Sequence, residues 1–114
     1  MVNYKGIILS LGSNIGDRET NLSLALLELA SIAQIKSVSS IYETEALLMK
    51  NQANFYNIAI EIEYTKNANN LLDEIKTIEI TLGRKKIIRY GPRIIDIDII
   101  FFRGENISTN LLTI

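Results

Sequence analysis

The segment at residues 94–102 constrains the fold of this chain more than any other. It reads Ile-Ile-Asp-Ile-Asp-Ile-Ile-Phe-Phe, an apolar run interrupted by two acids, Asp96 and Asp98. β-Branched and aromatic residues dominate the run, which favours a strand over a helix. Because successive side chains of a strand point to opposite faces, we expect the two acids to share one face and the neighbouring isoleucines to share the other.

Two carboxylates placed in this way predict a bound cation. They would lie roughly 6–7 Å apart along the strand, and at an effective dielectric constant of about 20 they would repel each other by about 2–3 kcal/mol. A cation, or basic residues nearby, would relieve this repulsion. Mg²⁺ takes one or two carboxylates together with substrate phosphate oxygens, so the pair suits a magnesium site. The alternative is an edge strand with two solvent-facing acids.

Basic residues are concentrated in the segment just before this strand. They are Arg84, Lys85, Lys86, Arg89 and Arg93, whereas the whole chain has a net charge of −1. The planar guanidinium of arginine can donate two hydrogen bonds to one phosphate group, which a lysine ammonium does less well, so the cluster suits a polyphosphate. Together with the acids it predicts phosphoryl transfer, in which positioning and charge neutralisation supply most of the catalysis. The near-neutral net charge argues against a general attraction to nucleic acid or to anionic membranes.

The composition limits the chemistry further. The chain has 114 residues, no cysteine and no histidine, so we expect one small domain without disulfides or zinc–thiolate sites. The absence of histidine removes the commonest general base and the commonest transition-metal ligand. The N-terminus does not read as a signal peptide and no apolar run is long enough to span a bilayer, so the expected location is cytoplasmic.

The rest of the chain predicts alternating strands and helices. Strands are predicted at residues 6–11, 35–44, 55–64 and 94–102, and amphipathic helices at residues 22–33 and 71–82. Asp17 is the expected N-cap of the first helix and Gly83 the C′ residue of the second. The order is that of an α+β, ferredoxin-like βαββαβ sandwich, with an antiparallel sheet and both helices on one face. Residues 12–17 are predicted to form a turn, with a phosphate-binding loop as the alternative.

Residues 91–99 carry a resemblance to a known family. Their sequence, Gly-Pro-Arg-Ile-Ile-Asp-Ile-Asp-Ile, resembles the signature of the 6-hydroxymethyl-7,8-dihydropterin pyrophosphokinases of folate biosynthesis. Residues 11–18, 42–45 and 54–57, together with Glu79, also match the pattern of that family, so the resemblance covers almost the whole chain. It implies transfer of a pyrophosphoryl group from ATP to the hydroxymethyl group of the pterin, with release of AMP.

The resemblance also implies a set of site residues. Two Mg²⁺ ions would be bound by Asp96 and Asp98, and the catalytic group would be completed by Arg84 and Arg93. The nucleotide would be bound by Glu79, Arg84, Lys86, Tyr90, Arg93, Ile99 and Thr113. The pterin would be bound by Thr44, Glu45, Leu47, Phe55 and Asn57. Phe55 would stack on the ring and Asn57 would read its hydrogen-bonding edge, although the residues alone favour core packing for Phe55 and leave Glu79 open as a surface acid.

The end of the chain departs from the family pattern. The family continues beyond the match at residues 112–114 into Pro-His, an arginine and a second aromatic residue, whereas this sequence stops at Ile114. The expectation is a single domain over residues 1–114 that lacks the family's C-terminal segment and binds ATP and the pterin. The alternative is a truncated, catalytically weak or inactive domain that acts as a fragment or assembly module, by self-association or with another folate-pathway domain. An RNA-binding module is disfavoured, because the strands lack paired exposed aromatic residues.

Overall fold

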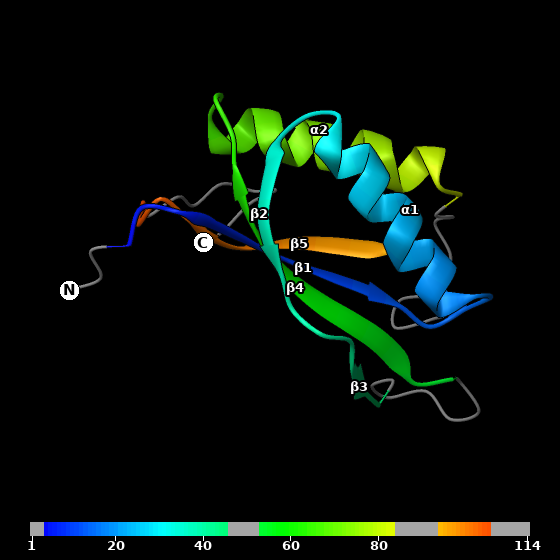
Figure 1. Ribbon diagram of the computed structural model, residues 1–114. Coiled ribbons are helices and arrows are strands. Elements are labelled where there is room, and N and C mark those ends of the chain that lie inside the picture. Colours follow the sequence, from blue (N-terminus) through cyan, green and yellow to red (C-terminus); the bar gives the residue numbers. More distant parts are fainter. Residues whose placement is uncertain (1–3, 46–52, 84–93, 106–114) are drawn as a thin grey trace.

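The computed structural model describes residues 4–45, 53–83 and 94–105. In these residues an antiparallel five-stranded sheet carries two helices (Figure 1). The elements are β1 (Ile7–Ser13), α1 (Arg18–Ala30), β2 (Gln34–Val38), β3 (Tyr42–Thr44), β4 (Phe55–Glu63), α2 (Ala68–Thr81) and β5 (Asp96–Phe102). The predicted α+β, ferredoxin-like arrangement is confirmed.

Strand β1 lies between β4 and β5 and pairs with both in the antiparallel sense. The strand order is β2-β4-β1-β5, and β3 also pairs with β4. The side chains of Ile7, Leu9 and Leu11 alternate along β1 and are at most 1% exposed. Burying an aliphatic side chain of this size contributes about 1.5–3 kcal/mol. The core therefore forms on one face of β1 and its neighbours.

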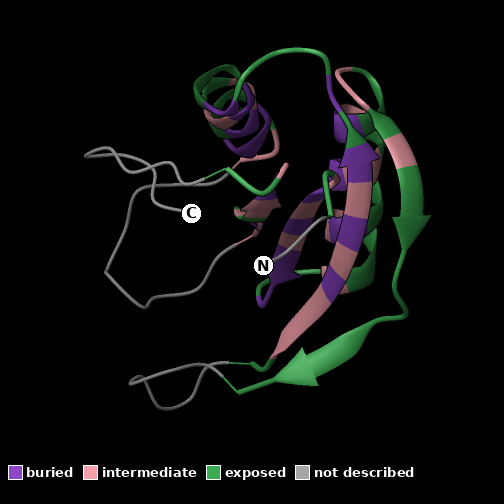
Figure 2. Ribbon diagram, turned by 90° about the vertical axis from the view of Figure 1, so that its left-hand side faces the viewer, coloured by how far each residue is buried: buried purple, intermediate pink, exposed green. Residues whose placement is uncertain are grey.

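Both helices cover this same face of the sheet (Figure 1). Helix α1 packs on β1, β4 and β2, helix α2 packs on β5, and the two helices contact each other. Figure 2 shows the buried residues where the helices meet the sheet, with β2 and β3 largely exposed. The described helices leave the opposite face of the sheet uncovered, and the polar side chains of β1, β4 and β5 lie on that face except for Ser13, which is buried on the helix side. No helix in the described part of the chain is long and apolar enough to cross a membrane.

The predicted strand at residues 35–44 is interrupted in the structure. It forms β2 and β3, both paired with β4, with residues 39–41 between them. Ser39 explains the break. Its backbone N–H donates to the Ala59 carbonyl at 2.9 Å, and its hydroxyl oxygen accepts the Ala59 N–H at 2.9 Å. The side chain therefore replaces a backbone partner, and the regular ladder ends there.

The helix ends follow the predicted capping chemistry. The Asp17 carboxylate accepts the Thr20 N–H at 3.1 Å at the start of α1, and the Asn67 side chain accepts the Asn70 N–H at 2.9 Å at the start of α2. Gly83, just after α2, has a φ of 93°, in the left-handed region that glycine enters without strain. The expected roles of Asp17 and Gly83 are confirmed.

Glu79 joins α2 to β5. Its side chain is buried, with the residue only 6% exposed, and its carboxylate accepts the Ile97 N–H at 2.9 Å. Strand β5 lies at one edge of the described sheet, so Glu79 provides an acceptor for a backbone group at that edge. Ile97 lies between the two acids of interest, which means that Glu79 fixes the strand segment that carries them.

We predict that Glu79→Ala lowers the free energy of unfolding by about 1–3 kcal/mol, because it leaves the Ile97 N–H buried without this acceptor. Glu79→Gln keeps an acceptor oxygen and should cost less. Urea unfolding of each variant measures the change. Asp73→Ala removes an exposed acid from the same helix and serves as the control. Equal losses for Glu79→Ala and Asp73→Ala would contradict the assigned bond.

The N-cap of α1 should make stability depend on pH. The backbone N–H of Thr20 holds the pKa of the Asp17 carboxyl below its usual value. Because the pKa of Asp17 is lower in the folded state than in the unfolded state, the cap makes its full contribution to the free energy of unfolding above the unfolded pKa, which is near 3.9. This stability is lost as the pH falls through the folded value. The difference in urea midpoint between the wild type and Asp17→Ala should therefore shrink as the solution is acidified below that range.

Asn67→Ala provides the matched control, because this cap of α2 carries no titrating group. Its cost, typically about 1 kcal/mol, should persist at low pH. An Asp17→Ala difference that stays constant from neutral to acidic pH would show that the carboxylate charge plays no part in the cap.

Candidate active site

The uncovered face of the sheet brings the predicted site residues together in a row across three strands. Gly12 of β1 pairs with Asn57 of β4 on one side and with Asp96 of β5 on the other. Ser10 pairs with Asp98 in the next row on the same face. Neighbouring strands lie about 4.8 Å apart, so the backbones at Asn57 and Asp96 are separated by about 10 Å.

The acid pair lies on β5 as the alternation predicted. Asp96 is half-buried and Asp98 is exposed, whereas Ile95 and Ile97 are buried on the helix side. A register shift after Ile99 then changes the alternation along the strand, so that Phe102, rather than Phe101, enters the core. The predicted common face of the two acids is confirmed.

The donor set at the acid pair suits a hard cation that a substrate helps to bind. In residues 4–45, 53–83 and 94–105 no three or more histidine, cysteine, aspartate or glutamate side chains form a group that could hold a metal ion. Two carboxylates alone suit Mg²⁺, because this ion keeps several waters and binds through one or two carboxylates plus substrate phosphates. An all-protein cage is not needed for this chemistry.

An aromatic ring and an amide lie on the other side of Gly12. Phe55 and Asn57 occupy alternate positions of β4, and both are half-buried on the uncovered face. The Asn57 amide donates to the Thr44 hydroxyl at 2.9 Å and to the Tyr42 carbonyl at 3.3 Å, so its orientation is fixed. Phe55 is not part of the core cluster that the described residues form, so the core packing that its residue type favoured is wrong.

Gly12 provides the space that these two side chains use. A Cβ atom at this position would lie 2.9 Å from the Asn57 Oδ1 atom and 3.3 Å from the Phe55 Cδ1 atom. The sequence had placed Gly12 and Ser13 in the turn that follows the strand, but in the structure both residues belong to β1. A glycine within a strand often marks a close approach of this kind, and this was the available signal for its role.

The connection between β1 and α1 contacts the beginning of β4. The Asn14 amide donates to the Ala53 carbonyl at 3.2 Å, and the Arg18 guanidinium donates to the Asn54 carbonyl at 2.8 Å. Ser13 and Asn14 are buried, and Ser13 accepts a hydrogen bond from Asn21 at 3.1 Å. These contacts favour a structural turn over a phosphate-binding loop. Sequence reasoning did not identify the contacts to residues 53 and 54, because the partners lie far apart in the chain.

The remaining predicted site residues are placed only in part. Glu45 is exposed just after β3, and the Ile99 side chain packs against the core from β5. Glu79 is buried behind β5 and is not the solvated surface acid that its sequence position left open. The predicted residues that lie outside the described part of the chain are Leu47, Arg84, Lys86, Tyr90, Arg93 and Thr113.

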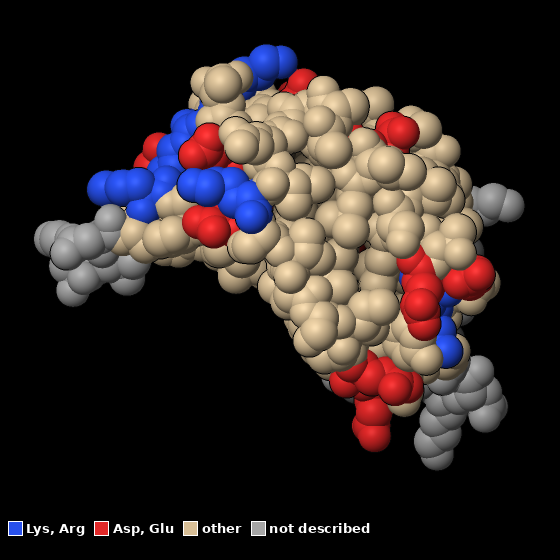
Figure 3. Space-filling view, in the orientation of Figure 1, with Lys and Arg blue, Asp and Glu red and all other residues tan. Residues whose placement is uncertain are grey.

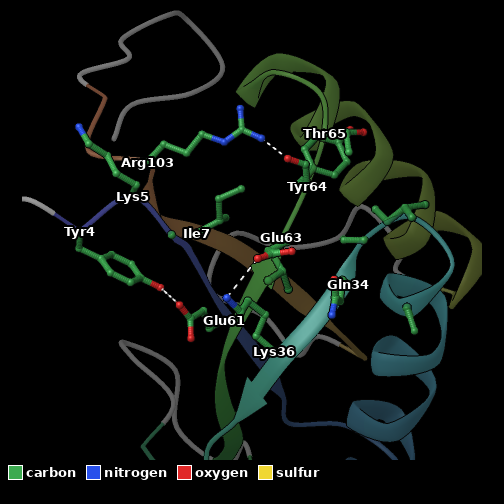
Figure 4. Close-up of a pocket in the computed structure, with 15 residues that line it drawn as sticks. Tyr4, Lys5, Ile7, Gln34, Lys36, Glu61, Glu63, Tyr64, Thr65 and Arg103 are labelled. Atoms are coloured by element: carbon green, nitrogen blue, oxygen red, sulfur yellow. Dashed lines mark hydrogen bonds and ion pairs between the residues drawn. The ribbon is translucent and has the colours of Figure 1, made fainter.

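A large hollow lies at the opposite end of the sheet (Figure 4). It has a volume of about 900 Å³ and is lined by residues at the start of β1, the end of α1, in β2, and at the ends of β4 and β5. Figure 3 shows basic side chains gathered over this end of the molecule. Among the residues that the structure describes, no predicted site residue lines the hollow.

Several polar groups of this hollow bind one another. Tyr4 donates to Glu61, and this hydrogen bond raises the pKa of the Tyr4 hydroxyl to about 12. Lys36 pairs with Glu63 at 3.1 Å, which raises the pKa of the lysine. We therefore take the row at Gly12, and not this hollow, as the candidate active site.

Comparisons with known proteins identify the family of this chain. A family model described as 7,8-dihydro-6-hydroxymethylpterin-pyrophosphokinase (HPPK) matches residues 8–114. A Bacillus subtilis protein named 2-amino-4-hydroxy-6-hydroxymethyldihydropteridine pyrophosphokinase is 45% identical over 108 residues, which cover 93% of this chain and 65% of that protein. An Aquifex aeolicus protein of the same name is 38% identical, covering 95% of this chain and 68% of that protein.

A third relative is longer. The mitochondrial folate synthesis bifunctional protein of Pisum sativum is 38% identical over 109 residues, which cover 95% of this chain and 21% of that protein. The chain thus spans about two thirds of the length of the two bacterial relatives. The family model matches nearly the whole sequence, and the fold is consistent with it. The chain belongs to the 7,8-dihydro-6-hydroxymethylpterin pyrophosphokinase family.

Proposed function

We propose that this protein transfers a pyrophosphoryl group from ATP to 6-hydroxymethyl-7,8-dihydropterin in folate biosynthesis, with Mg²⁺ as the metal ion and AMP as the second product. One observation carries the proposal. A ring-and-amide pair, Phe55 and Asn57, and an acid pair, Asp96 and Asp98, lie on the same face of the sheet. Asn57 and Asp96 pair with Gly12 from opposite sides, and the missing side chain of this glycine gives room to Phe55 and Asn57. The names of the bacterial relatives describe the same activity.

The ring-and-amide pair suits a flat heteroaromatic substrate. Such a ring requires an aromatic face and a few fixed hydrogen-bonding groups. Phe55 offers the face, and the Asn57 amide is held by Thr44 and Tyr42. The end of β3, at Thr44 and Glu45, lies beside β4 and would provide backbone groups for the edge of the ring.

The acid pair suits the polyphosphate. Asp96 and Asp98 would hold Mg²⁺, which when bound neutralises phosphate charge and orients the reacting oxygens. Because Glu79 fixes the Ile97 N–H, the segment that carries both carboxylates is ordered before substrates arrive. Groups fixed in this way stabilise developing charge without a cost of reorganisation at the moment of reaction.

The separation of the two pairs suits the reaction. A pterin held at Phe55 and Asn57 would extend over Gly12 toward β5, a distance of about 10 Å between backbones. The hydroxymethyl oxygen would then attack the β-phosphorus of ATP and lose its proton. The bond from that phosphorus to the α,β-bridging oxygen would break, and AMP would leave with this oxygen. We propose that Arg84 and Arg93 neutralise the triphosphate and that Lys86, Tyr90, Ile99 and Thr113 line the nucleotide, as the family resemblance implies. Ile99 would contribute its backbone, because its side chain packs against the core.

We predict that Asp98→Asn weakens binding of a non-hydrolysable ATP analogue by at least about tenfold, equivalent to 1.4 kcal/mol, when Mg²⁺ is present. The charge lost is one that the ion requires, so without Mg²⁺ the wild type and the variant should bind alike. Titration calorimetry measures both conditions. Glu63→Gln, an acid at the opposite end of β4, is the matched control. An affinity for the ATP analogue that depends neither on Mg²⁺ nor on the Asp98 substitution would overturn the metal assignment.

We also predict that Phe55→Ala weakens binding of 6-hydroxymethylpterin by about tenfold, or 1.4 kcal/mol, because it removes the stacking face. Affinity for the ATP analogue should not change. Phe101→Ala removes a second aromatic residue, one that packs against Tyr4 with a ring separation of 5.4 Å at the other end of the sheet. This control should leave pterin binding intact. Equal effects of the two substitutions would show that Phe55 does not contact the pterin.

A further inference from the structure

We infer that Arg18 is a positioning residue for the pterin half of the site. This inference rests on the proposed function and adds to it a residue that lies on the helix side of the sheet. Arg18 is the first residue of α1, and its guanidinium reaches the beginning of β4. It would act on the substrate only through the strand that it holds.

Two contacts of Arg18 enclose Phe55 along the chain. One guanidinium N–H donates to the Asn54 carbonyl at 2.8 Å, and the Arg18 Cζ atom lies 3.8 Å from the centre of the Tyr56 ring. Fixing the residues on both sides of Phe55 fixes its backbone. Because side chains alternate on a strand, holding Tyr56 on the helix face directs Phe55 and Asn57 to the uncovered face.

The beginning of β4 depends on such contacts. The ladder between β3 and β4 ends at the pair Thr44 and Phe55, so Asn54 lies one residue before it. Asn54 is held from two sides, by Arg18 at its carbonyl and by Glu43, which accepts a hydrogen bond from its amide at 3.2 Å. Position 54 thus connects α1 to β3, the two elements that flank the ring-binding residues.

The two contacts require an arginine. A planar guanidinium can donate from its edge while its face lies on an aromatic ring, whereas a lysine ammonium is a point charge without a face. Asp17 caps α1 immediately before Arg18, which fixes the point from which the side chain extends. We therefore expect lysine at position 18 to fail although it keeps the charge.

Arg18→Lys and Tyr56→Leu test this inference. Both remove the stacked contact, and each should raise the dissociation constant for 6-hydroxymethylpterin by about tenfold, since a small misplacement at a distance from the chemistry has effects of this order. Affinity for the ATP analogue with Mg²⁺ should stay unchanged. Lys66→Met removes a cation that pairs with Glu74 elsewhere on the surface, and it is the control.

A second measurement uses the protein without ligands. NMR signals of the Asn57 side-chain amide and the Phe55 ring should shift or broaden in Arg18→Lys and Tyr56→Leu but not in Lys66→Met. Unchanged Asn57 and Phe55 signals with unchanged pterin affinity would overturn the inference. A parallel loss of affinity for both ligands, with a lower melting temperature, would also overturn it, since that result indicates a general structural role.

The two proposals fail in different ways. If the wild type binds the ATP analogue but no pterin, the assignment of Phe55 and Asn57 to a pterin is wrong. The positioning role of Arg18 for that substrate is then wrong as well. If the wild type binds the pterin and Arg18→Lys binds it equally well, the proposed function stands and only the role of Arg18 is wrong.

Discussion

The pairing of β1 with a strand on each side is the constraint on which the site depends. Leu11 and its partner Ile97 face the helices, and the next residues, Gly12 and Asp96, face away. A slip of one residue would turn the carboxylates of β5 into the core and its isoleucines outward, which the burial of apolar side chains strongly opposes. The hydrophobic pattern therefore fixes the register, and the register places the acids beside Gly12.

Charged residues of the two helices hold the strands β4 and β5, which flank β1 at the site, from the helix side of the sheet. Glu79 of α2 binds the backbone of β5 between the two acids, and Arg18 of α1 binds the chain that enters β4. Both side chains form hydrogen bonds to backbone groups that have no partner in the sheet ladder. Neither side chain occupies the uncovered face, where the residues proposed to bind the substrates lie. A site whose members are fixed by such supporting contacts is ordered before the substrates bind.

Local patterns predicted what depends on neighbouring residues. The alternation at residues 94–102 predicted that Asp96 and Asp98 share a face, and capping chemistry predicted the roles of Asp17 and Gly83. The break at residues 39–41 could not be predicted, because it arises when the Ser39 hydroxyl bonds a residue of another strand.

The missed assignments share one cause. The residue type of Phe55 favoured the core, but which face of a strand the helices cover is set by the whole sheet. Whether Glu79 is exposed or buried depends on which strand lies beside the end of α2, and here that strand is β5. The close approach at Gly12 and the contacts of Arg18 involve residues more than 30 positions away. Such facts follow from the tertiary arrangement and not from any local sequence pattern.

The location of the nucleotide-bound metal tests the account most directly. Mn²⁺ added with a non-hydrolysable ATP analogue broadens the NMR signals of nearby backbone amides. The account predicts the strongest broadening at Ser10, Gly12 and Asp98, with sharp signals at Gln34 and Arg103, which line the hollow at the other end of the sheet. Broadening centred on the hollow, with sharp signals from the row at Gly12, would contradict it.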